Sequence, residues 1–454
     1  MLGPINRRRA LWAPLLVLAS VAKASAAGMP DVEALTAGYN ASGLMLYRNL
    51  AGTPGNIVLS PYSIGSALAM VRSGAGGETE REMARALKQT LPRAAAETAS
   101  AKLLAILDGY DRTSKPGHCP QGAHWSGKRC EAPPVMKDMR CPPFMTVNDG
   151  LCISGPIGAS ATLVAANALM LPKGAGAISD AYRATVRDVY GATIREGAGV
   201  AEVNAWVKER TAGKIDRIID RLPNAAGPVL LNAIYLKAAW GTPFAERATR
   251  DESFSLTGGQ RVRVPTMHRT SELALVERAG YRAVRLDYSQ RSLGMIVVLP
   301  DEIAGLDAVT RRLDAGELAA LLGSLRLTEH RPVALALPRF KASFSADLVP
   351  PLQSAGIRLA FSDHADFSGI TGAAPGARGL RIAAVRHRAV IEVTEAGTEA
   401  AAATAIAMAK ASLPIRRPDP VPFVVDRPFL FLLIDDASGA VLFQGRIADP
   451  RSPA

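Results

Sequence analysis

One stretch of this chain decides its fold: Glu395-Ala396-Gly397-Thr398-Glu399-Ala400-Ala401-Ala402-Ala403-Thr404. Alanine, glutamate, methionine and lysine favour helices, so residues 398–409 can be read as an alanine-rich surface helix. The same run can be read as a strand, because it has no proline before Pro414 and every backbone N–H can join a hydrogen-bond ladder. In a strand, one alternate set is uncharged and begins with small side chains, as buried positions require: Thr398, Ala400, Ala402, Thr404, Ile406 and Met408. The residues alone leave both readings open.

Around this stretch, early helices are followed by many strands. Apolar residues recur at helical spacing in residues 31–49, 63–71, 180–190 and 201–222. The pattern then changes, and the apolar run 229–236 after Gly227-Pro228 predicts a strand that is buried on both faces. Further strands are predicted at residues 261–267, 283–286, 294–299, 333–337, 390–393, 429–434 and 441–443. Helices first and strands later predict an α+β fold.

Five sets of phrases, in the same order along nearly the whole chain, resemble the serpin family. They are Asn56-Ile57-Val58-Leu59-Ser60-Pro61-Tyr62-Ser63-Ile64 with Gly74-Ala75-Gly76-Gly77-Glu78-Thr79; Asn232-Ala233-Ile234-Tyr235-Leu236-Lys237 with Trp240 and Phe244; Leu335-Ala336-Leu337-Pro338-Arg339-Phe340 with Asp366-Phe367-Ser368-Gly369-Ile370; the stretch 395–404; and Asp426-Arg427-Pro428-Phe429-Leu430-Phe431 with Leu442-Phe443-Gln444-Gly445-Arg446. Five phrases in one order are more specific than any single motif.

This resemblance implies an inhibitory serpin, in which residues 27–454 form a single domain. Such a domain packs several helices on a large mixed sheet, adds smaller sheets and exposes a reactive loop, here residues 395–425. The family inhibits serine proteases as suicide substrates: the loop is cleaved, inserts into the central sheet as a new strand and traps the acyl-protease. The resemblance therefore favours the strand reading. The hinge that it assigns comprises Glu395, Gly397, Thr398, Glu399, Ala400, Ala401, Ala402, Ala403 and Thr404.

The family's usual spacing also implies where the loop is cut. Counting fourteen residues from Gly397 places the reactive bond between Ala411 and Ser412. A small alanine there suits the shallow pocket of an elastase-like protease. Lys410, one residue earlier, is the alternative and suits a trypsin-like pocket. The segment between Ala411 and Pro428 is several residues longer than the family's, so the bond stays open to within a few residues.

By the same resemblance, one set of residues marks where the strands of the sheet separate: Asn56, Ser60, Ser63, Asn232, Trp240 and His387. Short polar side chains can exchange hydrogen bonds while such a gap widens. The routine alternative is helix capping by Ser60 and Ser63 and a satisfied core histidine at His387.

All four cysteines fall in residues 113–156, a stretch rich in proline, glycine and charge without apolar periodicity. The stretch is duplicated: Cys119 to Cys130 and Cys141 to Cys152 each read Cys-Pro, an aromatic residue, a glycine and Cys. We interpret it as a surface insertion that is held together by disulfides. The repeat favours the pairs Cys119–Cys130 and Cys141–Cys152. A zinc site is the rival interpretation, but two cysteines at two-to-four-residue separation are missing.

The N-terminus carries the features of a secretory signal peptide, which we assign to residues 1–26. Arg7, Arg8 and Arg9 precede a largely apolar run over residues 10–22, and small residues follow at 24–27. An ordinary N-terminal helix is the alternative. The signal predicts an extracytoplasmic protein, secreted or periplasmic. No apolar run reaches the roughly 20 residues that span a bilayer, so we expect no membrane span.

Composition narrows the class of partners. The chain of 454 residues is 48% hydrophobic and 21% charged, which is typical of a globular protein with a sizeable core. Its net charge of +12 is dispersed over the sequence. A dispersed excess predicts a solvated surface with weak affinity for polyanions rather than a nucleic-acid site. We expect a monomer whose partner is a serine protease.

Enzyme motifs are missing from the sequence. There is no Gly-x-Ser-x-Gly elbow of a serine hydrolase, and the glycines of residues 74–79 lack the lysine of a phosphate-binding loop. We therefore predict no catalytic residues, no metal and no cofactor. The second functional hypothesis is a non-inhibitory binding or storage protein of the same fold. Thr398 and the alanines after it favour inhibition, because bulky or charged hinge residues would oppose insertion.

Overall fold

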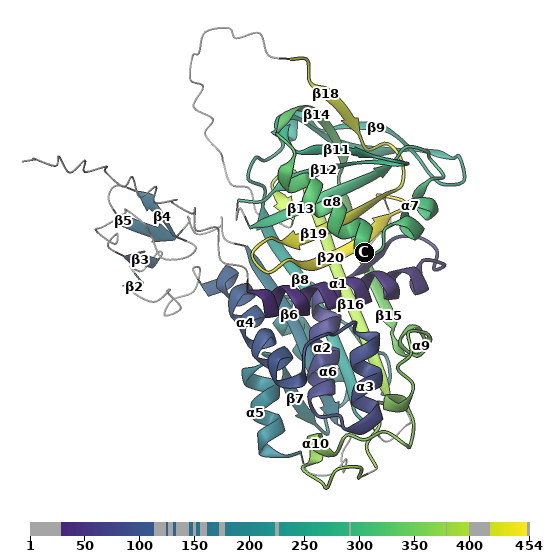
Figure 1. The fold of residues 1–454 in the computed structure, drawn as a ribbon. Coiled ribbons are helices and arrows are strands. Elements are labelled where there is room, and N and C mark those ends of the chain that lie inside the picture. Colours follow the sequence, from purple (N-terminus) through teal and green to yellow (C-terminus); the bar gives the residue numbers. More distant parts are fainter. Residues whose placement is uncertain are drawn as a thin grey trace, which may run out of the picture.

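The computed structural model describes residues 29–112, 124–125, 130–132, 145–148, 151–154, 161–171, 178–222, 227–289, 292–377, 379–398 and 418–451. Long strands run down the molecule, helices cover one of their faces, and two further sheets form the other pole (Figure 1). The observed fold is therefore α+β, as the sequence predicts.

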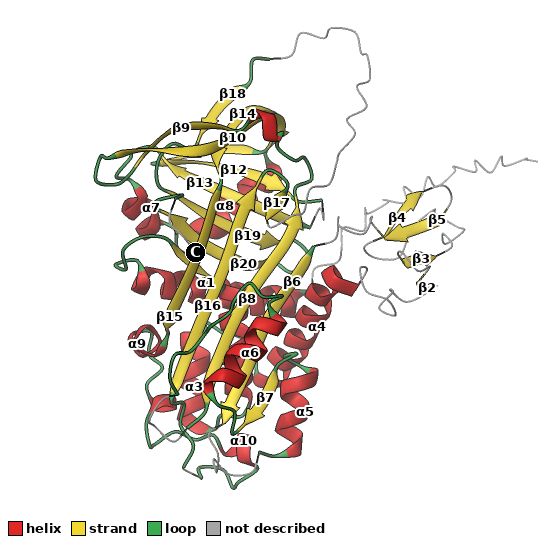
Figure 2. Ribbon diagram, turned by 180° about the vertical axis from the view of Figure 1, so that it is seen from behind, coloured by secondary structure: helices red, strands yellow, loops and turns green. Residues whose placement is uncertain are grey.

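The long strands form a mixed six-stranded sheet that Figure 2 shows from the face on which α6 lies, a helix over Val200–Arg210. Its order is β15 (Phe340–Asp347), β16 (Ala384–Thr394), β17 (Gly397–Thr398), β8 (Val229–Ala239), β6 (Thr162–Leu171) and β7 (Thr193–Glu196). β8 is buried at all residues but Lys237, so the prediction of a strand buried on both faces is confirmed. Even-numbered residues of β8 face the main core, and odd-numbered ones face α6 (Val200–Arg210).

Two more sheets build the opposite pole. One has the order β1 (Ile57–Leu59), β20 (Ala440–Ile447), β19 (Phe429–Asp435), β13 (Leu293–Pro300), β12 (Tyr281–Asp287) and β11 (Leu275–Arg278). The other has the order β18 (Val421–Val424), β14 (Arg331–Pro338), β10 (Arg261–Leu273) and β9 (Arg250–Ser255). β18 occupies part of the range 395–425 that the sequence assigns to the hinge and loop.

Three of the described helices, α2 (Pro61–Ser73), α5 (Asp180–Asp188) and α8 (Ala315–Leu327), begin at a capping side chain. Ser60 accepts a hydrogen bond from the Ser63 N–H at the start of α2, and Ser179 and Asp314 cap α5 and α8 in the same way. The helices and short 3-10 turns are α1 (Pro30–Leu50), α2 (Pro61–Ser73), α3 (Gly77–Ala86), α4 (Arg93–Arg112), α5 (Asp180–Asp188), η1 (Glu246–Ala248), α7 (Leu306–Arg312), α8 (Ala315–Leu327), α9 (Val349–Ser354), η2 (Leu359–Phe361) and α10 (Ser368–Thr371).

The helix predicted over residues 201–222 is wrong in its second half, because α6 ends at Arg210. Ala212 and Gly213 adopt positive φ angles of 52° and 79°, which break the helix. The hydroxyl of Thr211 donates to the carbonyl of Val207 (2.8 Å) and accepts from the N–H of Ile215 (3.1 Å), which fixes the turn. The apolar residues beyond it still reach the core that lies between α6 and the sheet.

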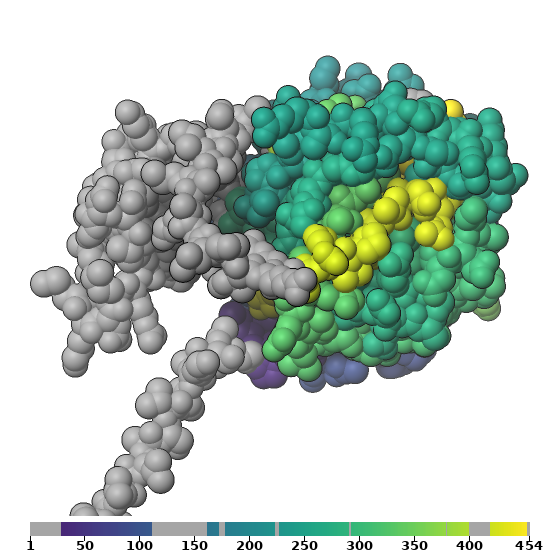
Figure 3. Space-filling model, turned by 90° about the horizontal axis from the view of Figure 1, so that it is seen from above, coloured from purple at the N-terminus to yellow at the C-terminus, as the bar shows by residue number. Residues whose placement is uncertain are grey.

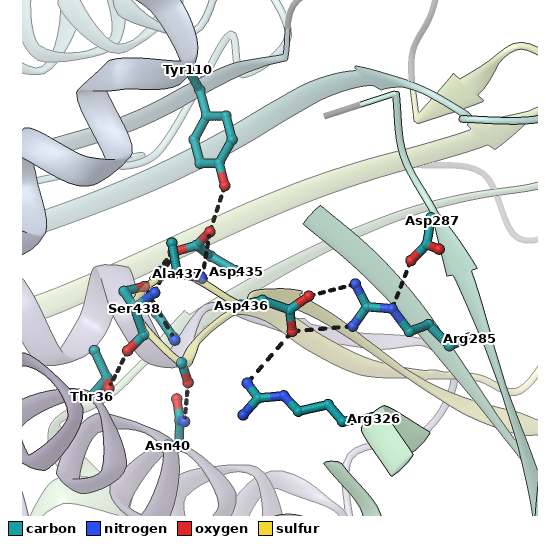
Figure 4. Close-up of polar contacts among 12 residues, drawn as sticks. Thr36, Asn40, Tyr110, Arg285, Asp287, Arg326, Asp435, Asp436, Ala437 and Ser438 are labelled. Atoms are coloured by element: carbon teal, nitrogen blue, oxygen red, sulfur yellow. Dashed lines mark hydrogen bonds and ion pairs between the residues drawn. The ribbon is translucent and has the colours of Figure 1, made fainter. Parts of the chain in front are cut away.

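A buried turn between β19 and β20 ties the termini of the fold together (Figure 4). Asp435 is fully buried and accepts hydrogen bonds from the hydroxyl of Tyr110 on α4 (2.5 Å) and the N–H of Ser438 (2.9 Å). Burial raises the pKa of Asp435 despite these donors. Thr36 and Asn40 of α1 donate hydrogen bonds to the next carbonyl oxygens, those of Ser438 and Gly439 respectively. Each of these bonds is 2.8 Å long. The turn thus joins α1, α4 and the C-terminal strands.

The cysteine-containing insertion has a sheet of its own, which the sequence did not predict. Its strands are β2 (His124–Trp125), β3 (Cys130–Ala132), β5 (Leu151–Ser154) and β4 (Met145–Asn148), in that order. Trp125 lies opposite Cys130 in the first hairpin, and Val147 lies opposite Cys152 in the second. Both pairs are related by one shift of 22 residues, from Trp125 to Val147 and from Cys130 to Cys152. The duplicated sequence units therefore fold as duplicated hairpins.

Candidate functional site

The centre of the long sheet is split at one end by a two-residue strand. β17 pairs antiparallel with both neighbours, so that Thr398 lies opposite Val393 of β16 and Ala238 of β8. Further down, β16 and β8 pair directly with each other in parallel, from Val390–Tyr235 to Ala384–Val229. The start of the predicted hinge is therefore already seated in the sheet, and the gap closes below it.

Aromatic side chains hold this seat in place. Thr398 is fully buried, and its hydroxyl lies 2.5 Å from that of Tyr288. The ring of Tyr288 stacks on Trp240 with centroids 4.4 Å apart. The indole N–H of Trp240 donates to the carbonyl oxygen of Thr394 (3.0 Å). The backbone N–H of Trp240 donates to the carbonyl oxygen of Ala396 (3.0 Å). Trp240 therefore belongs to the hinge seat, next to the point where the sheet divides.

Glu395 anchors the turn that leads into the hinge. It is 5% exposed, and its carboxylate accepts hydrogen bonds from the Arg339 guanidinium (2.6 and 2.8 Å) and from the hydroxyl of Thr249. Burial raises the pKa of Glu395, but these hydrogen bonds outweigh it and the pKa lies below its usual value. The Phe244 N–H also donates to the Glu395 carbonyl (2.9 Å). Charge-assisted bonds thus fix the hinge at its base.

Gly397 is required by close backbone contact. Its φ angle is +150°, a conformation that residues with a side chain rarely adopt. A Cβ atom at this position would lie 2.1 Å from the carbonyl oxygen of Ala238 on β8. Only glycine lets the hinge approach β8 closely enough to pair with it.

A second polar cluster bridges β16, β8, β6 and α2 where the parallel pairing is intact. Asn232 donates to Asn167 Oδ1 (2.6 Å) and to Ser63 Oγ (2.5 Å), and Ser63 Oγ donates to Asn167 (3.3 Å). Nδ1 of His387 donates to Asn232 Oδ1, and all four residues are at most 4% exposed. The structure thus brings together Ser63, Asn232 and His387, three of the residues that the sequence groups as the place where strands separate.

Asn167 is the member that sequence reasoning missed. It is the only amide in the apolar strand β6, and it lies opposite Asn232 in the antiparallel pair. A single strongly polar residue in a run destined for the interior requires a buried partner. That signal was available in the sequence, but the identity of the partner depended on the strand register.

His387 is held neutral by its surroundings. Its Nε2 atom is buried and has no hydrogen-bond partner in the part of the chain that the structure describes. Burial lowers the pKa of His387 to about 3. Separating β16 from β8 would break the hydrogen bond from His387 to Asn232, so this cluster, called the clasp below, holds the two strands together.

The remaining predicted site residues lie elsewhere. Ser60 is an ordinary helix cap. Asn56 is not part of the cluster: it accepts from the N–H of Ala448 (2.7 Å) and donates to the carbonyl of Asp449 (2.9 Å), so it joins the start of β1 to the C-terminus. Outside the described residues lie Glu399, Ala400, Ala401, Ala402, Ala403, Thr404, Lys410, Ala411, Ser412, Cys119 and Cys141.

Among the described residues, no group of three or more histidine, cysteine or acidic side chains lies close enough together to hold a metal ion. None of the described helices is long and apolar enough to cross a bilayer.

Comparison with known proteins gives consistent matches. A family model described as Serpin (serine protease inhibitor) matches residues 37–120 and 148–450, and the unmatched residues between them fall in the cysteine-containing insertion. An uncharacterized serpin-like protein of Thermococcus kodakarensis is 32% identical over 415 residues, covering 89% of this chain and 83% of that protein. The leukocyte elastase inhibitor of Bos taurus is 32% identical over 413 residues, covering 87% and 93%.

Solved structures share the fold. Serpin48 of the insect Tenebrio molitor matches with a TM-score of 0.70 at 26% identity, covering 93% of this chain and 99% of that chain. Human thyroxine-binding globulin, in complex with thyroxine, matches with a TM-score of 0.73 at 24% identity, covering 93% and 100%. At that identity the second match shows the fold alone.

The buried histidine makes stability depend on pH in a defined direction. An unfolded histidine takes up a proton near pH 6.5, whereas folded His387 stays neutral down to about pH 3. Neutral His387 should therefore make its full contribution to the free energy of unfolding above pH 6.5. This contribution should fall as the pH drops, by up to about 1.4 kcal/mol per pH unit for this one proton. Urea unfolding at pH 7.5 and 5.5 should show a smaller fall for His387→Gln than for the parent. His364→Gln, at an exposed histidine, is the control, and equal falls in all three proteins would contradict the prediction.

Proposed function

Because this chain belongs to the serpin family, we propose that it inhibits a serine protease as a suicide substrate. Cleavage frees residues 399–407 to continue β17 down the gap between β16 and β8, and the attached acyl-protease is trapped. The observation that carries the proposal is the seated hinge: Gly397 and Thr398 already occupy the entrance to that gap. The protein supplies a substrate loop and needs no catalytic residue or cofactor of its own.

The register of β17 gives the position that each loop residue would take. Each step along the loop moves one residue back along both neighbours, since β17 is antiparallel to both. Thr404 would therefore lie opposite His387 and Asn232, the two members of the clasp. Residue 407 would lie opposite Ala384 and Val229, where the pairing of β16 with β8 ends. The gap therefore has room for residues 399–407, and this stretch of the loop contains no proline.

Side-chain sizes fit this register. Thr398 faces the core, so Ala400 and Ala402 would also face it. Ala400 would lie between Leu236 and Ile391, which are both large and buried. Small residues between large neighbours can enter a packed sheet without overpacking it.

Insertion would also improve backbone pairing. The single parallel ladder between β16 and β8 would be replaced by two antiparallel ladders, one on each side of the new strand. Backbone groups of residues 399–407 would gain hydrogen-bond partners on both sides of the new strand. The gain in hydrogen bonds and buried apolar contacts supplies the driving force that distorts the protease.

We propose an elastase-like target cleaved at Ala411-Ser412, with a trypsin-like target cleaved at Lys410 as the alternative. A small residue before the bond and the similarity to a leukocyte elastase inhibitor both support the first. Residues 1–26 would export the protein, so that it meets its target outside the cytoplasm. A non-inhibitory carrier is the second candidate, since a structural relative binds thyroxine. The hinge favours inhibition because Thr398 is uncharged and already seated.

Thr398→Arg should convert the inhibitor into an ordinary substrate. The variant must bury a charge at the mouth of the gap, which costs several kcal/mol and delays insertion until the acyl bond is hydrolysed. Incubation with pancreatic elastase and with trypsin should give an SDS-stable complex for the parent and only cleaved protein for the variant. Glu399→Arg is the matched control, because residue 399 would lie on the other face beside the half-exposed Lys237 and Glu392. If Thr398→Arg forms the SDS-stable complex as readily as the parent does, the mechanism is contradicted.

We propose that the insertion is a separate module, stapled by Cys119–Cys130 and Cys141–Cys152. Its strands join none of the three main sheets. Ala132 lies opposite Cys152, and Cys130 precedes Ala132 by two residues on β3. The Cα atoms of Cys130 and Cys152 are therefore about 8 Å apart. A disulfide needs a Cα separation below about 7 Å, which argues against Cys130–Cys152. Of the three pairings, the one within each hairpin matches the repeat.

Peptide mapping without reduction tests this pairing on the secreted protein. Proteolysis should release one disulfide-linked fragment that contains Cys119 and Cys130 and another that contains Cys141 and Cys152. Each bridge closes a short loop, worth roughly 2–3 kcal/mol to the module. Recovery of Cys119 linked to Cys152 would show that the hairpins are cross-linked to each other instead.

A further inference from the structure

The turn between β12 and β13 lies against the hinge seat on one of its sides. The hydroxyl of Tyr288 is 2.5 Å from that of Thr398. The next N–H, that of Ser289, donates to the carbonyl oxygen of Ala239 at the end of β8 (2.8 Å). The N–H of Tyr288 closes the turn by donating to the carbonyl oxygen of Leu293 (3.1 Å). The position of the Tyr288 hydroxyl therefore depends on where the whole turn is held.

The other side of the turn is held by Tyr110, near the end of α4. The hydroxyl of Tyr110 donates to Oδ1 of Asp435 (2.5 Å; Figure 4) and lies 2.6 Å from Oγ of Ser292. A phenol has one O–H, and this one is directed at the carboxylate, so the hydroxyl of Ser292 is the donor to Tyr110. Burial, followed by the nearby carboxylate of Asp435, raises the pKa of Tyr110, so the phenol keeps its proton. The side chain of Ser292 is thus tied through Tyr110 to a buried carboxylate, the stronger kind of acceptor.

This support lies inside the molecule rather than on its surface. Figure 3 looks down on the pole beside the hinge end of the long sheet and shows β18, in yellow, at the surface. Tyr288 and Tyr110 are buried, with 0% and 1% of each residue exposed. Solvent therefore cannot readily replace the hydrogen bonds of Tyr110, and their loss would leave buried polar groups without a partner.

Ion pairs hold other parts of the same turn. Arg285 donates from Nε to Oδ1 of Asp287, the last residue of β12, and from Nη2 to Oδ2 of Asp436, each over 2.7 Å (Figure 4). The N–H of Asp436 also donates to the carbonyl oxygen of Ser292 (2.8 Å). These bonds fix the strand before the turn and the backbone at its end. Loss of the Tyr110 hydroxyl would therefore loosen the turn without unfolding the strands beside it.

We propose that Tyr110 is a positioning residue for the hinge seat. Through Ser292 it holds the turn in place, and the turn holds the hydroxyl of Tyr288 at Thr398. Without this support, Gly397 and Thr398 leave the mouth of the gap more often. A hinge outside the mouth starts insertion later, so more of the acyl bond is hydrolysed before the protease is trapped. This effect on trapping rests on the proposed function, whereas the effect on the hinge itself does not.

Hydrogen exchange measures the seating of the hinge without any protease, because the pairing of β17 with both neighbours protects the backbone at residues 397–398. Tyr110→Phe removes one hydroxyl together with its hydrogen bonds. Ser292→Ala removes only the side-chain bond toward the turn and leaves the bond from Tyr110 to Asp435. Tyr182→Phe is the matched control, since it removes a hydroxyl that is also buried and donates to a backbone carbonyl of α2 (2.9 Å).

Tyr110→Phe and Ser292→Ala should each speed exchange at residues 397–398 at least about 5-fold, the effect of one lost hydrogen bond, and Tyr182→Phe should leave it unchanged. With a protease that the parent traps, the stoichiometry of inhibition should rise in the first two variants and not in the control. Hinge exchange that is equal in the parent and in Ser292→Ala would overturn the inference, even if Tyr110→Phe is too unstable to compare. Equally faster exchange in Tyr182→Phe would show a loss of general stability and would overturn it too.

The two readouts separate this inference from the proposed function. Faster hinge exchange with an unchanged stoichiometry of inhibition would overturn the role of Tyr110 in trapping while the proposed function stands. If the parent forms no SDS-stable complex with elastase-like or trypsin-like proteases, the proposed function fails. The exchange rates of the parent and the three variants then still decide whether Tyr110 positions the hinge.

Discussion

The fold depends on how the two residues Gly397 and Thr398 fit between β16 and β8. They add a strand between β16 and β8 at one end of the long sheet, whereas β16 and β8 pair directly with each other below them. Between β16 and β8 the described part of the sheet therefore holds an extra strand at its mouth and none beneath it. The aromatic stack under Thr398 and the ion pair at Glu395 keep the chain at that entrance. In the proposed mechanism, β16 and β8 would exchange their pairing with each other for pairing with the inserted loop.

The clasp of Ser63, Asn167, Asn232 and His387 and the hinge seat act on the same gap from different positions. The seat fixes where a new strand would enter, and the clasp resists the separation of β16 from β8 further down. Breaking buried hydrogen bonds without replacement is costly, so in the proposed mechanism β16 and β8 would stay paired until the loop can take its place between them. In the proposed inserted state Thr404 would lie at the clasp, where its hydroxyl would replace lost partners. Packing and polar satisfaction therefore favour the same rearrangement.

Local patterns predicted the strands well, because runs such as β8 and β19 are apolar throughout and bounded by turn residues. The resemblance to the serpin family and the expected fold are confirmed by the family match and the solved structures. The end of α6 was missed because Ala212 adopts a positive φ. Alanine rarely does so, and the sequence therefore gives no sign of it. Asn167 was missed, and Asn56 was grouped with the clasp, because both placements depend on which strands are neighbours. Such long-range register is not encoded in any single stretch.

The central claim is that the closed gap will accept the loop as a strand, and the stability of the cleaved protein tests it most directly. Cutting the loop with a protease that the protein does not trap leaves residues 399–407 free to insert. Each inserted residue adds about one backbone hydrogen bond, worth about 1 kcal/mol, so the thermal midpoint of the cleaved protein should rise by at least about 10 °C. A cleaved protein that unfolds at the same temperature as the intact one would contradict the account.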